Sequence, residues 1–440
     1  MLPDDDLLEI FDFYVIGSRD RWQTLVHVCR RWRSIVFGSP RRLNLRLVCS
    51  TNTPTVTLDV WPPLPIVIED SHYQKGLIAL LERSELVPRI THIEIWNVRL
   101  EDFSKLMEVP FPELTDLILH HSVDEMEQVN PLSDSFLGGS APRLQILELN
   151  RIPFPGLPKL LLSATHLTRL HLRNIPHSGY ISPEAMVARL SMLTRLGELS
   201  LDFQSPQSRP NRESCRPPPS TRTVLPVLTW FLFHGHGEYL EELMARIDAP
   251  QLNNLFITFS NDIIFDTPQF TRLIRDTPAF NAFDKARVSL GGDFVGMRLS
   301  SKASGDEQLD VKMLCRDPMQ LSFLEHVCTS SLSPLSTLED LYIDEHLYRE
   351  PVWEDNALWL ELLHPFMVVK NLFLSERIAP RVVPALQELV GGRTMEVLPT
   401  LQNVFIQGLQ PSGPVREGVG KFVAARQLAS HPIAVSQWDG

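Results

Sequence analysis

The sequence predicts an α/β protein, in which a short all-α module precedes a solenoid whose curved parallel sheet carries helices on its convex side. Three observations lead to this prediction. Residues 1–47 contain two stretches with helical apolar spacing. From residue 90 onward a short apolar phrase recurs, mostly every 23–32 residues. With 440 residues, the chain is too long for one compact core and suits an elongated array.

The first predicted helix begins at three aspartates. Asp4–Asp6 can accept the free backbone N–H groups of a helix start, and their charge suits the positive end of the helix dipole. Leu7, Phe11, Tyr14 and Val15 then fall on one face of that helix.

A second helix is predicted from about Trp22 to Val36, ending before Gly38-Ser39-Pro40. Its apolar stripe consists of Leu25, Val28, Cys29, Trp32, Ile35 and Val36. Helices this short bury little surface by themselves, so they must pack against the rest of the chain or against another protein.

This module resembles an F-box. The family pattern of Leu-Pro, Leu-x-x-Ile-Phe and Val-Cys-x-x-Trp is matched by Leu2-Pro3, Leu7, Ile10-Phe11, Val28-Cys29 and Trp32. The chain departs from the family where the first helix closes, with Tyr14-Val15 in place of the frequent Tyr-Leu. Plain core packing against a neighbouring domain is the alternative interpretation of the apolar stripes.

The resemblance implies that the module binds a Skp-type adaptor, and through it a cullin. The residues implied for adaptor binding are Leu2, Pro3, Leu7, Leu8, Ile10, Phe11, Leu25, Val28, Cys29, Trp32 and Ile35.

The recurring phrase reads apolar-x-x-apolar-x-apolar. Its copies begin at Ile90, Leu114, Leu144, Leu167, Leu196, Leu228, Leu252, Leu338, Val369 and Leu401. In each short strand the last two apolar residues point to one side, so stacked copies form a parallel sheet over a common core. The long gap holds a weak copy near Phe283–Val288 and an expected strand at Leu309–Met313, and the repeat count between residues 258 and 337 stays open.

This period is that of a leucine-rich repeat, and the region resembles the irregular leucine-rich repeats that follow F-boxes in fungal proteins. Generic α/β strands are the alternative. The family's asparagine, three positions past the last leucine, is absent, so a regular asparagine ladder is not expected there. Helices returning between strands are predicted at Tyr239–Ile247, Gln269–Arg275, Gln320–Val327, Ala357–Leu363 and Val382–Val390.

The expected domain organisation follows from these patterns. The F-box spans residues 1–47, a connecting segment and the start of the solenoid 48–87, and the repeats 88–410. A proline-rich, polar flexible loop is expected at 205–223. Residues 411–440 are expected to form a C-terminal cap, with the Gly- and Pro-rich stretch 411–420 as the exit from the solenoid.

No sequence motif indicates catalysis, a cofactor or a metal. GxSxG, P-loop, HExxH and dinucleotide fingerprints are absent. The five cysteines include no CxxC pair, and His234-Gly-His236 is more typical of surface histidines than of metal ligands. We therefore expect no enzyme activity, no cofactor and no metal site.

Charge and hydropathy exclude further classes. A net charge of −12 argues against a general nucleic-acid binder. The acidic N-terminus is unlike a secretory signal, and no apolar run reaches the length of a membrane span. Scattered cysteines without a disulfide pattern suit the cytoplasm or nucleus.

The expected function is that of a substrate-receptor subunit in an SCF-type (Skp adaptor–cullin–F-box) ubiquitin ligase, with an unknown protein target held by the repeats. The alternative is a non-ubiquitinating binding scaffold. Within each phrase, the residue between the last two apolar positions should face the concave surface. Glu148, His171 and Ser200 are therefore expected to be surface sites, and Leu147, Leu170 and Leu199 to be buried.

In the second half of the chain, this middle position is apolar or aromatic in every copy. Exposed aromatic rows usually mark binding surfaces. The expected target-binding residues are Phe256, Tyr342, Phe373 and Phe405, with Arg169, His171 and Arg173 as an acidic or phosphate contact. Alternatively, the C-terminal tail or a long loop covers the aromatic row.

Overall fold

A computed structural model of the chain describes residues 2–15, 21–49, 58, 60–70, 82–98, 107–121, 131–155, 157–204, 222–260, 267–281, 283–302, 308–314, 319–331, 333–345, 356–389 and 393–438. Residues 205–221 of the predicted loop at 205–223 therefore lie outside the described residues. The chain divides into two compact units. Unit 1 comprises Met1–Ile181 and Ala188–Leu196, and unit 2 comprises Ser182–Val187 and Gly197–Gly440.

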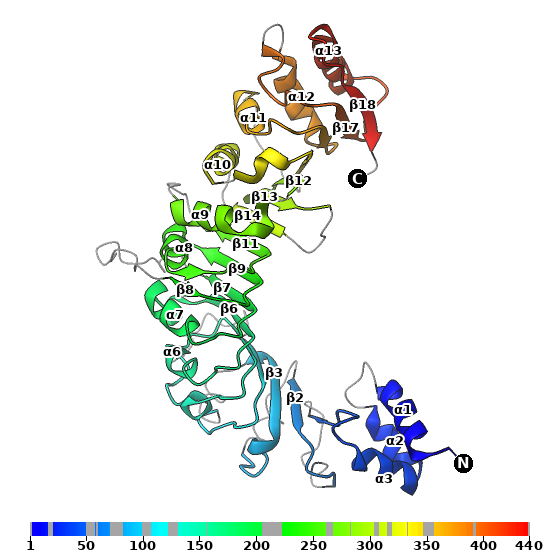
Figure 1. Cartoon of the computed structure of the whole chain (residues 1–440), viewed down its shortest axis with the longest axis vertical. Coiled ribbons are helices and arrows are strands. Elements are labelled where there is room, and N and C mark those ends of the chain that lie inside the picture. Colours follow the sequence, from blue (N-terminus) through cyan, green and yellow to red (C-terminus); the bar gives the residue numbers. More distant parts are fainter. Residues whose placement is uncertain are drawn as a thin grey trace. The chain divides into compact units, whose positions relative to one another are not determined.

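Three short helices open unit 1: α1 (Asp4–Val15), α2 (Trp22–Val28) and α3 (Arg30–Gly38) (Figure 1). The prediction of one helix from Trp22 to Val36 is wrong, because the backbone is extended at Cys29. The Sγ atom of Cys29 accepts a hydrogen bond from the backbone N–H of Trp32 and so caps the start of α3. The predicted apolar stripe is thus divided between two helices, with Leu25 and Ile35 buried and Val28 exposed.

Parallel strands make up the rest of unit 1, and they follow one another along the sheet in chain order. They are β1 (Leu47–Cys49), β2 (Ile66–Asp70), β3 (Ile90–Val98), β4 (Asp116–His121), β5 (Ile146–Asn150) and β6 (Arg169–Ile175). The sheet thus begins two strands before the first recognised phrase. Its register aligns Leu117, Leu147 and Leu170, and all three are fully buried, as the phrase predicts.

Unit 2 contains a second run of strands. They are β7 (Glu198–Phe203), β9 (Trp230–Gly235), β11 (Asn254–Phe259), β12 (Lys285–Leu290), β13 (Phe294–Ser300), β14 (Gln308–Leu314), β15 (Asp340–Glu345), β16 (Asn371–Leu374), β17 (Asn403–Gln407) and β18 (Ala434–Trp438). A separate two-stranded ladder pairs β8 (Thr223–Val224) with β10 (Ile247–Asp248).

The sheet of unit 2 is not wholly parallel, which corrects the prediction. Its order is β11-β14-β13-β12-β15, and β13 is antiparallel to both β12 and β14. After β11 the chain forms β12 three places further along the sheet, and β13 and β14 then fill the two places between them. A tight turn at Gly291, whose N–H donates to Phe294 O, closes the first hairpin. Between residues 258 and 337, where the sequence left the repeat count open, the described residues thus include the three strands β12, β13 and β14.

Helices lie along one side of the strands, as predicted for a solenoid of this kind (Figure 1). α8 (Gly237–Met244), α9 (Pro268–Asp276), α10 (Met319–His326), α11 (Asn356–Leu363) and α12 (Ala379–Gln387) match the predicted return helices within a few residues. Not predicted were α6 (Leu157–Leu160) and α7 (Pro183–Leu190). None of the helices in the described part of the chain has the length and apolar character to cross a membrane.

The stretch 411–420, predicted as an exit segment, instead enters the long helix α13 (Pro414–Leu428). Pro414 suits the first turn of a helix, where no N–H partner is needed. Gly418 lies against α12, where a Cβ atom would meet Val383 and Gln387. Arg426 is fully buried and donates to the carbonyl oxygens of Val397 and Leu398, at 2.9 and 2.7 Å. Gly418 therefore allows α13 to pack closely on α12 and does not end the helix.

Polar side chains also line up along the strand starts of unit 2. Asn403 Nδ2 donates to Asn371 Oδ1, and Asn371 Nδ2 donates to Asp340 Oδ1, each at 2.7 Å. A short ladder of polar side chains thus exists. Its residues stand directly before the second apolar residue of the phrase, whereas the family's asparagine follows the last apolar residue.

Leu147→Ala should destabilise the chain by about 2–5 kcal/mol, because it leaves a cavity between Leu117 and Leu170. Gln145, an exposed residue in the same phrase, is the matched control, and Gln145→Ala should cost under about 0.5 kcal/mol. Urea unfolding of both variants measures the difference. Equal losses would show that the register is wrong.

Candidate functional site

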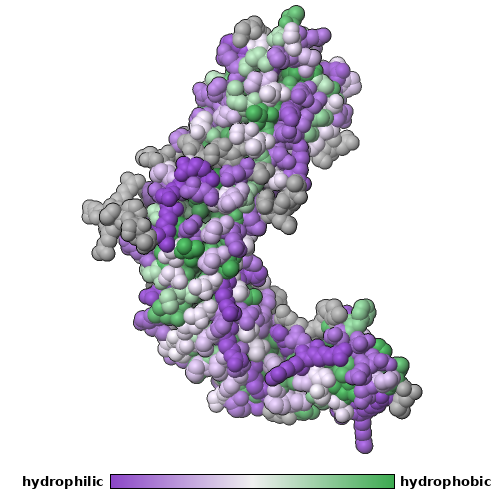
Figure 2. All heavy atoms as spheres, in the orientation of Figure 1, coloured by the Kyte–Doolittle hydropathy of each residue, from purple (hydrophilic) through white to green (hydrophobic). Residues whose placement is uncertain are grey.

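The N-terminal helices carry an exposed apolar face. On α1, Ile10 is 52% exposed and Phe13 is 81% exposed, and Tyr14 completes the i, i+3, i+4 set. Leu2, before α1, and Val28, at the end of α2, are also more than half exposed. Figure 2 shows such apolar residues among polar ones on the surface of this module.

Contacts through Arg31 bring the two halves of the F-box pattern together. Its Nη2 donates to the carbonyl oxygen of Leu2 at 2.6 Å, and its Nε donates to Asp4 Oδ1 at 3.0 Å. The Leu2-Pro3 pair is therefore held beside the start of α3, directly after Val28-Cys29. Residues far apart in sequence thus contribute to one surface.

Some residues of the predicted adaptor-binding set lie inside the module. Leu7, Phe11, Leu25 and Ile35 are buried in the core of the module, so they support the face and do not line it. Trp32 is half-buried and packs on Phe11, with ring centroids 4.7 Å apart.

The remaining predicted residues are at the surface. Pro3 and Cys29 are exposed, with Leu2, Ile10 and Val28, and Leu8 is half-buried. Phe13 was not singled out from the sequence, and Tyr14 was assigned to the helix face of Leu7 and Phe11, although Tyr14 is exposed. The spacing of both residues from Ile10 was a usable signal.

Trp22 fixes the module to the segment that follows it. Its indole Nε1 donates to Arg46 O at 2.9 Å, directly before β1. Its ring also meets Trp61 and Phe37 edge-on, at 5.3 and 6.0 Å between centroids. This anchoring uses a face of the module other than Ile10 and Phe13, which stay exposed.

A row of aromatic rings crosses three strands of unit 2. Tyr342, Phe373 and Phe405 are in register on β15, β16 and β17. Tyr342 and Phe373 stack with centroids 4.2 Å apart, and Phe373 and Phe405 with centroids 4.5 Å apart. All three are half-buried, so we name them the aromatic row.

The C-terminal strand covers part of the aromatic row, as the alternative interpretation proposed. Trp438, the last residue of β18, meets Phe373 and Tyr342 edge-on at 5.4 and 5.9 Å. Burial raises the pKa of the Tyr342 hydroxyl. The row is thus a partly covered surface, with rings still accessible at its edges.

Phe256 is not part of this row. In the register of the sheet, Asp310, Arg298 and Arg287 stand between Phe256 and Tyr342. The reversed order of β12–β14 inserts these charges. Phe256 instead lies near Trp230, with centroids 5.7 Å apart. Arg287 also approaches the face of Tyr342, at 5.3 Å from its centroid, which favours a cation–π contact.

The predicted acidic or phosphate contacts Arg169, His171 and Arg173 belong to unit 1, whereas the aromatic row belongs to unit 2. His171 is buried, with Nδ1 3.4 Å from Glu148 Oε2, and Arg173 Nη1 lies 3.5 Å from Glu148 Oε1. Burial alone would raise the pKa of Glu148, but the His171 hydrogen bond and the Arg173 charge lower it. Two of the three predicted cationic contacts are thus engaged by a carboxylate of the same chain.

The middle positions are also less exposed than predicted. Ser200 and His171 are buried, and Glu148 is half-buried. Strands in a sheet lie about 4.8 Å apart, so long side chains on neighbouring strands cover short ones.

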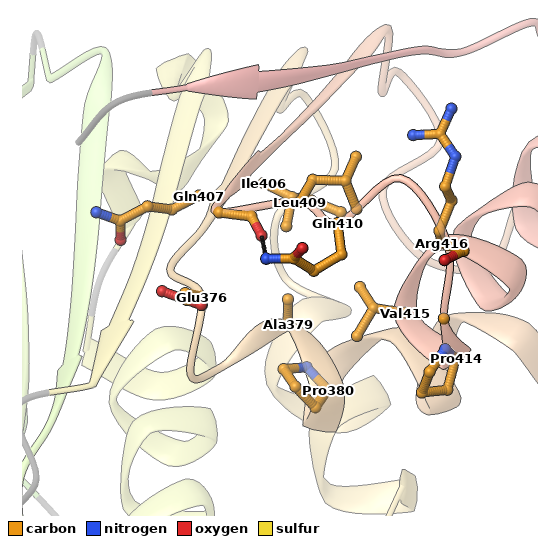
Figure 3. Close-up of a pocket in the computed structure, with 13 residues that line it drawn as sticks. Glu376, Ala379, Pro380, Ile406, Gln407, Leu409, Gln410, Pro414, Val415 and Arg416 are labelled. Carbon is orange, nitrogen blue, oxygen red and sulfur yellow. Dashed lines mark hydrogen bonds between the residues drawn. The ribbon is translucent and has the colours of Figure 1, made fainter.

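A pocket of about 210 Å³ lies where β17, α12 and α13 meet (Figure 3). Its lining is mostly apolar and includes Ala379, Ile406 and Val415. Two charged side chains, Glu376 and Arg416, also contribute, but Arg416 extends away from Glu376. Because most of the lining is apolar, the pocket suits packing of a small apolar group.

Comparisons with known proteins do not identify a family for this chain. No protein-family model matches the chain. No curated protein is found to match its sequence. Among solved structures, the leucine-rich repeat-containing protein LegL7 from Legionella pneumophila is similar at 10% identity, with a TM-score of 0.31 over 86% of this chain and 96% of that one. The description of the fold therefore rests on the strand register given above.

Phe373→Ala should destabilise unit 2 more than Phe405→Ala, by about 1 kcal/mol. Phe373 contacts the rings of Tyr342, Phe405 and Trp438, whereas Phe405 stacks on Phe373. Each aromatic pair contributes about 0.5–1.5 kcal/mol beyond burial. Urea unfolding of the two single variants gives the comparison. Equal destabilisation would mean that Trp438 and Tyr342 do not pack on Phe373 in solution.

Proposed function

We propose that this chain is the substrate-receptor subunit of an SCF-type ubiquitin ligase. In this proposal α1–α3 bind a Skp-type adaptor, which binds a cullin, and the repeats hold a protein target. The chain itself does no chemistry and acts in the cytoplasm or nucleus. It holds target lysines near a charged conjugating enzyme and thereby raises their effective concentration.

The exposed apolar face of α1–α3 is the observation that carries the proposal. The module already has a core of its own, which includes Leu7 and Phe11, yet Ile10, Phe13 and Val28 remain in solvent. Exposed apolar groups that gather on one surface usually mark a protein interface. Charged residues such as Asp4 and Arg31 border the face, as is typical of interfaces with an apolar centre and a polar rim.

The repeats support the target-binding half of the proposal. Parallel strands present the aromatic row in unit 2 and a column of polar side chains in unit 1. Aromatic residues are enriched at the centres of protein interfaces. We infer that the target is a protein and that the aromatic row contributes to its binding.

A non-ubiquitinating scaffold is the second candidate, because nothing in adaptor binding requires delivery of a target. Reconstitution separates the two candidates. Purified adaptor, cullin complex, conjugating enzymes and a captured partner should give partner ubiquitination that depends on α1–α3. Stable capture of the partner without its modification would favour the scaffold.

Phe13→Ala and Val28→Ala should each weaken binding to a purified Skp-type adaptor about 30-fold, equivalent to about 2 kcal/mol for an interface hot spot. Leu162→Ala is the matched control, since Leu162 is an exposed leucine away from this face. Surface plasmon resonance measures the three affinities. Trp32→Ala is a poorer probe because Trp32 also packs on Phe11. Unchanged affinity in the Phe13 and Val28 variants would reject the adaptor-binding face.

Cys29 offers a test without mutation. Its side chain is exposed, whereas Cys49 is buried, and burial raises the Cys49 thiol pKa to about 11. Thiolate is the reactive form, so maleimide at pH 7 should modify Cys29 before Cys49. Bound adaptor should slow Cys29 modification at least tenfold and leave Cys49 unchanged, as followed by peptide mass spectrometry. Equal Cys29 rates with and without adaptor would contradict the proposed contact.

A further inference from the structure

Three potential metal ligands converge on unit 1, on the face of the sheet that carries the middle positions. Glu94 and His92 are two residues apart on β3, so their side chains share a face. Glu69 on β2 is the register partner of Glu94. One ligand atom from each of the three residues lies within 4.8 Å of the others.

His92 is held in the orientation that a metal ligand requires. The residue is 6% exposed, and its Nδ1 lies 3.5 Å from Asp116 Oδ2 on the neighbouring strand β4. A carboxylate at this position can accept the Nδ1 proton of the imidazole, which leaves the Nε2 lone pair available, as in metal sites where a carboxylate orients the histidine.

The Nε2 atom of His92 is buried and has no hydrogen-bond partner among the described residues. It lies 3.6 Å from Glu94 Oε2, while Glu94 Oε1 accepts a hydrogen bond from Trp96 Nε1 at 3.0 Å. A lone pair that faces a carboxylate oxygen is unfavourable unless a proton or a cation stands between them.

We propose that Glu69, His92 and Glu94 form a binding site for a divalent transition-metal ion, with zinc as the preferred ion. One imidazole nitrogen and two carboxylate oxygens suit zinc, which takes such ligands at about 2.0–2.2 Å, and the fourth position is left for water. The ion would link β2 to β3 near the start of the repeats.

A nearby cluster shows why composition alone does not make such a site. Glu148 lies close to two histidines, with Oε1 3.6 Å from His120 Nε2 and Oε2 3.4 Å from His171 Nδ1. However, Arg173 already provides a positive charge 3.5 Å from Glu148 Oε1. A fixed guanidinium disfavours a second cation, so this cluster is a matched control.

Zinc binding to the metal-stripped full-length chain tests the proposal, by competition with a chromophoric chelator. The wild type should bind one equivalent that Glu69→Gln and Glu94→Gln each weaken at least tenfold, while Glu148→Gln retains it. Asp116→Asn, which changes only the group that orients His92, should weaken zinc binding about 10- to 100-fold. Calcium and magnesium should not compete at equal concentration, because imidazole is a poor ligand for both.

Glu69 and Glu94 are half-exposed, so their amide variants should keep the fold, and circular dichroism checks this. The proposal fails if no zinc equivalent is sensitive to these variants, or if Glu148→Gln loses the same equivalent. It also fails if NMR shows His92 protonated on both nitrogens at pH 7 with zinc present, since a proton would then occupy the place of the metal.

Discussion

In-register pairing of parallel strands determines which side chains of the repeats lie in the core and which lie on the opposite face of the sheet. Because successive residues of a strand alternate between faces, Leu117, Leu147 and Leu170 meet in the core while their neighbours line the opposite face. The same register stacks Phe373 on Phe405 in unit 2. A slip of one residue would exchange the two faces, so core stability and surface chemistry depend on one constraint.

The strands and return helices could be predicted because their signals are local. Each copy of the apolar phrase is only six residues long. The apolar spacing of a helix is visible within one or two turns, as at α11 and α12. The reversed order of β12, β13 and β14 could not be predicted, because strand order depends on distant pairing. The role of Gly418 was equally hard to predict. Glycine usually disfavours a helix, but here it lies within α13 and allows that helix to approach α12 closely.

The candidate binding surfaces were partly predictable for a similar reason. The sequence pattern indicates which residues belong to the N-terminal module, but not which of them its own packing buries, as it does Leu7 and Phe11. The aromatic row was visible in the phrase, whereas its contact with Trp438 required the position of β18. Glu69, the third proposed metal ligand, lies on β2, a strand without a recognised copy of the phrase. From the sequence, His92 and Glu94 alone did not indicate a metal site.

Disulfide trapping measures the register most directly. Ile118 and Glu148 are register partners on β4 and β5, both half-buried, and cysteines at such positions are close enough to form a disulfide. Ile118→Cys with Glu148→Cys should therefore crosslink under mild oxidation, as detected by peptide mass spectrometry. Ile118→Cys with Leu149→Cys should not, because the two side chains point to opposite faces. Crosslinking of the second pair in preference to the first would contradict the register that places Leu117, Leu147 and Leu170 in one core.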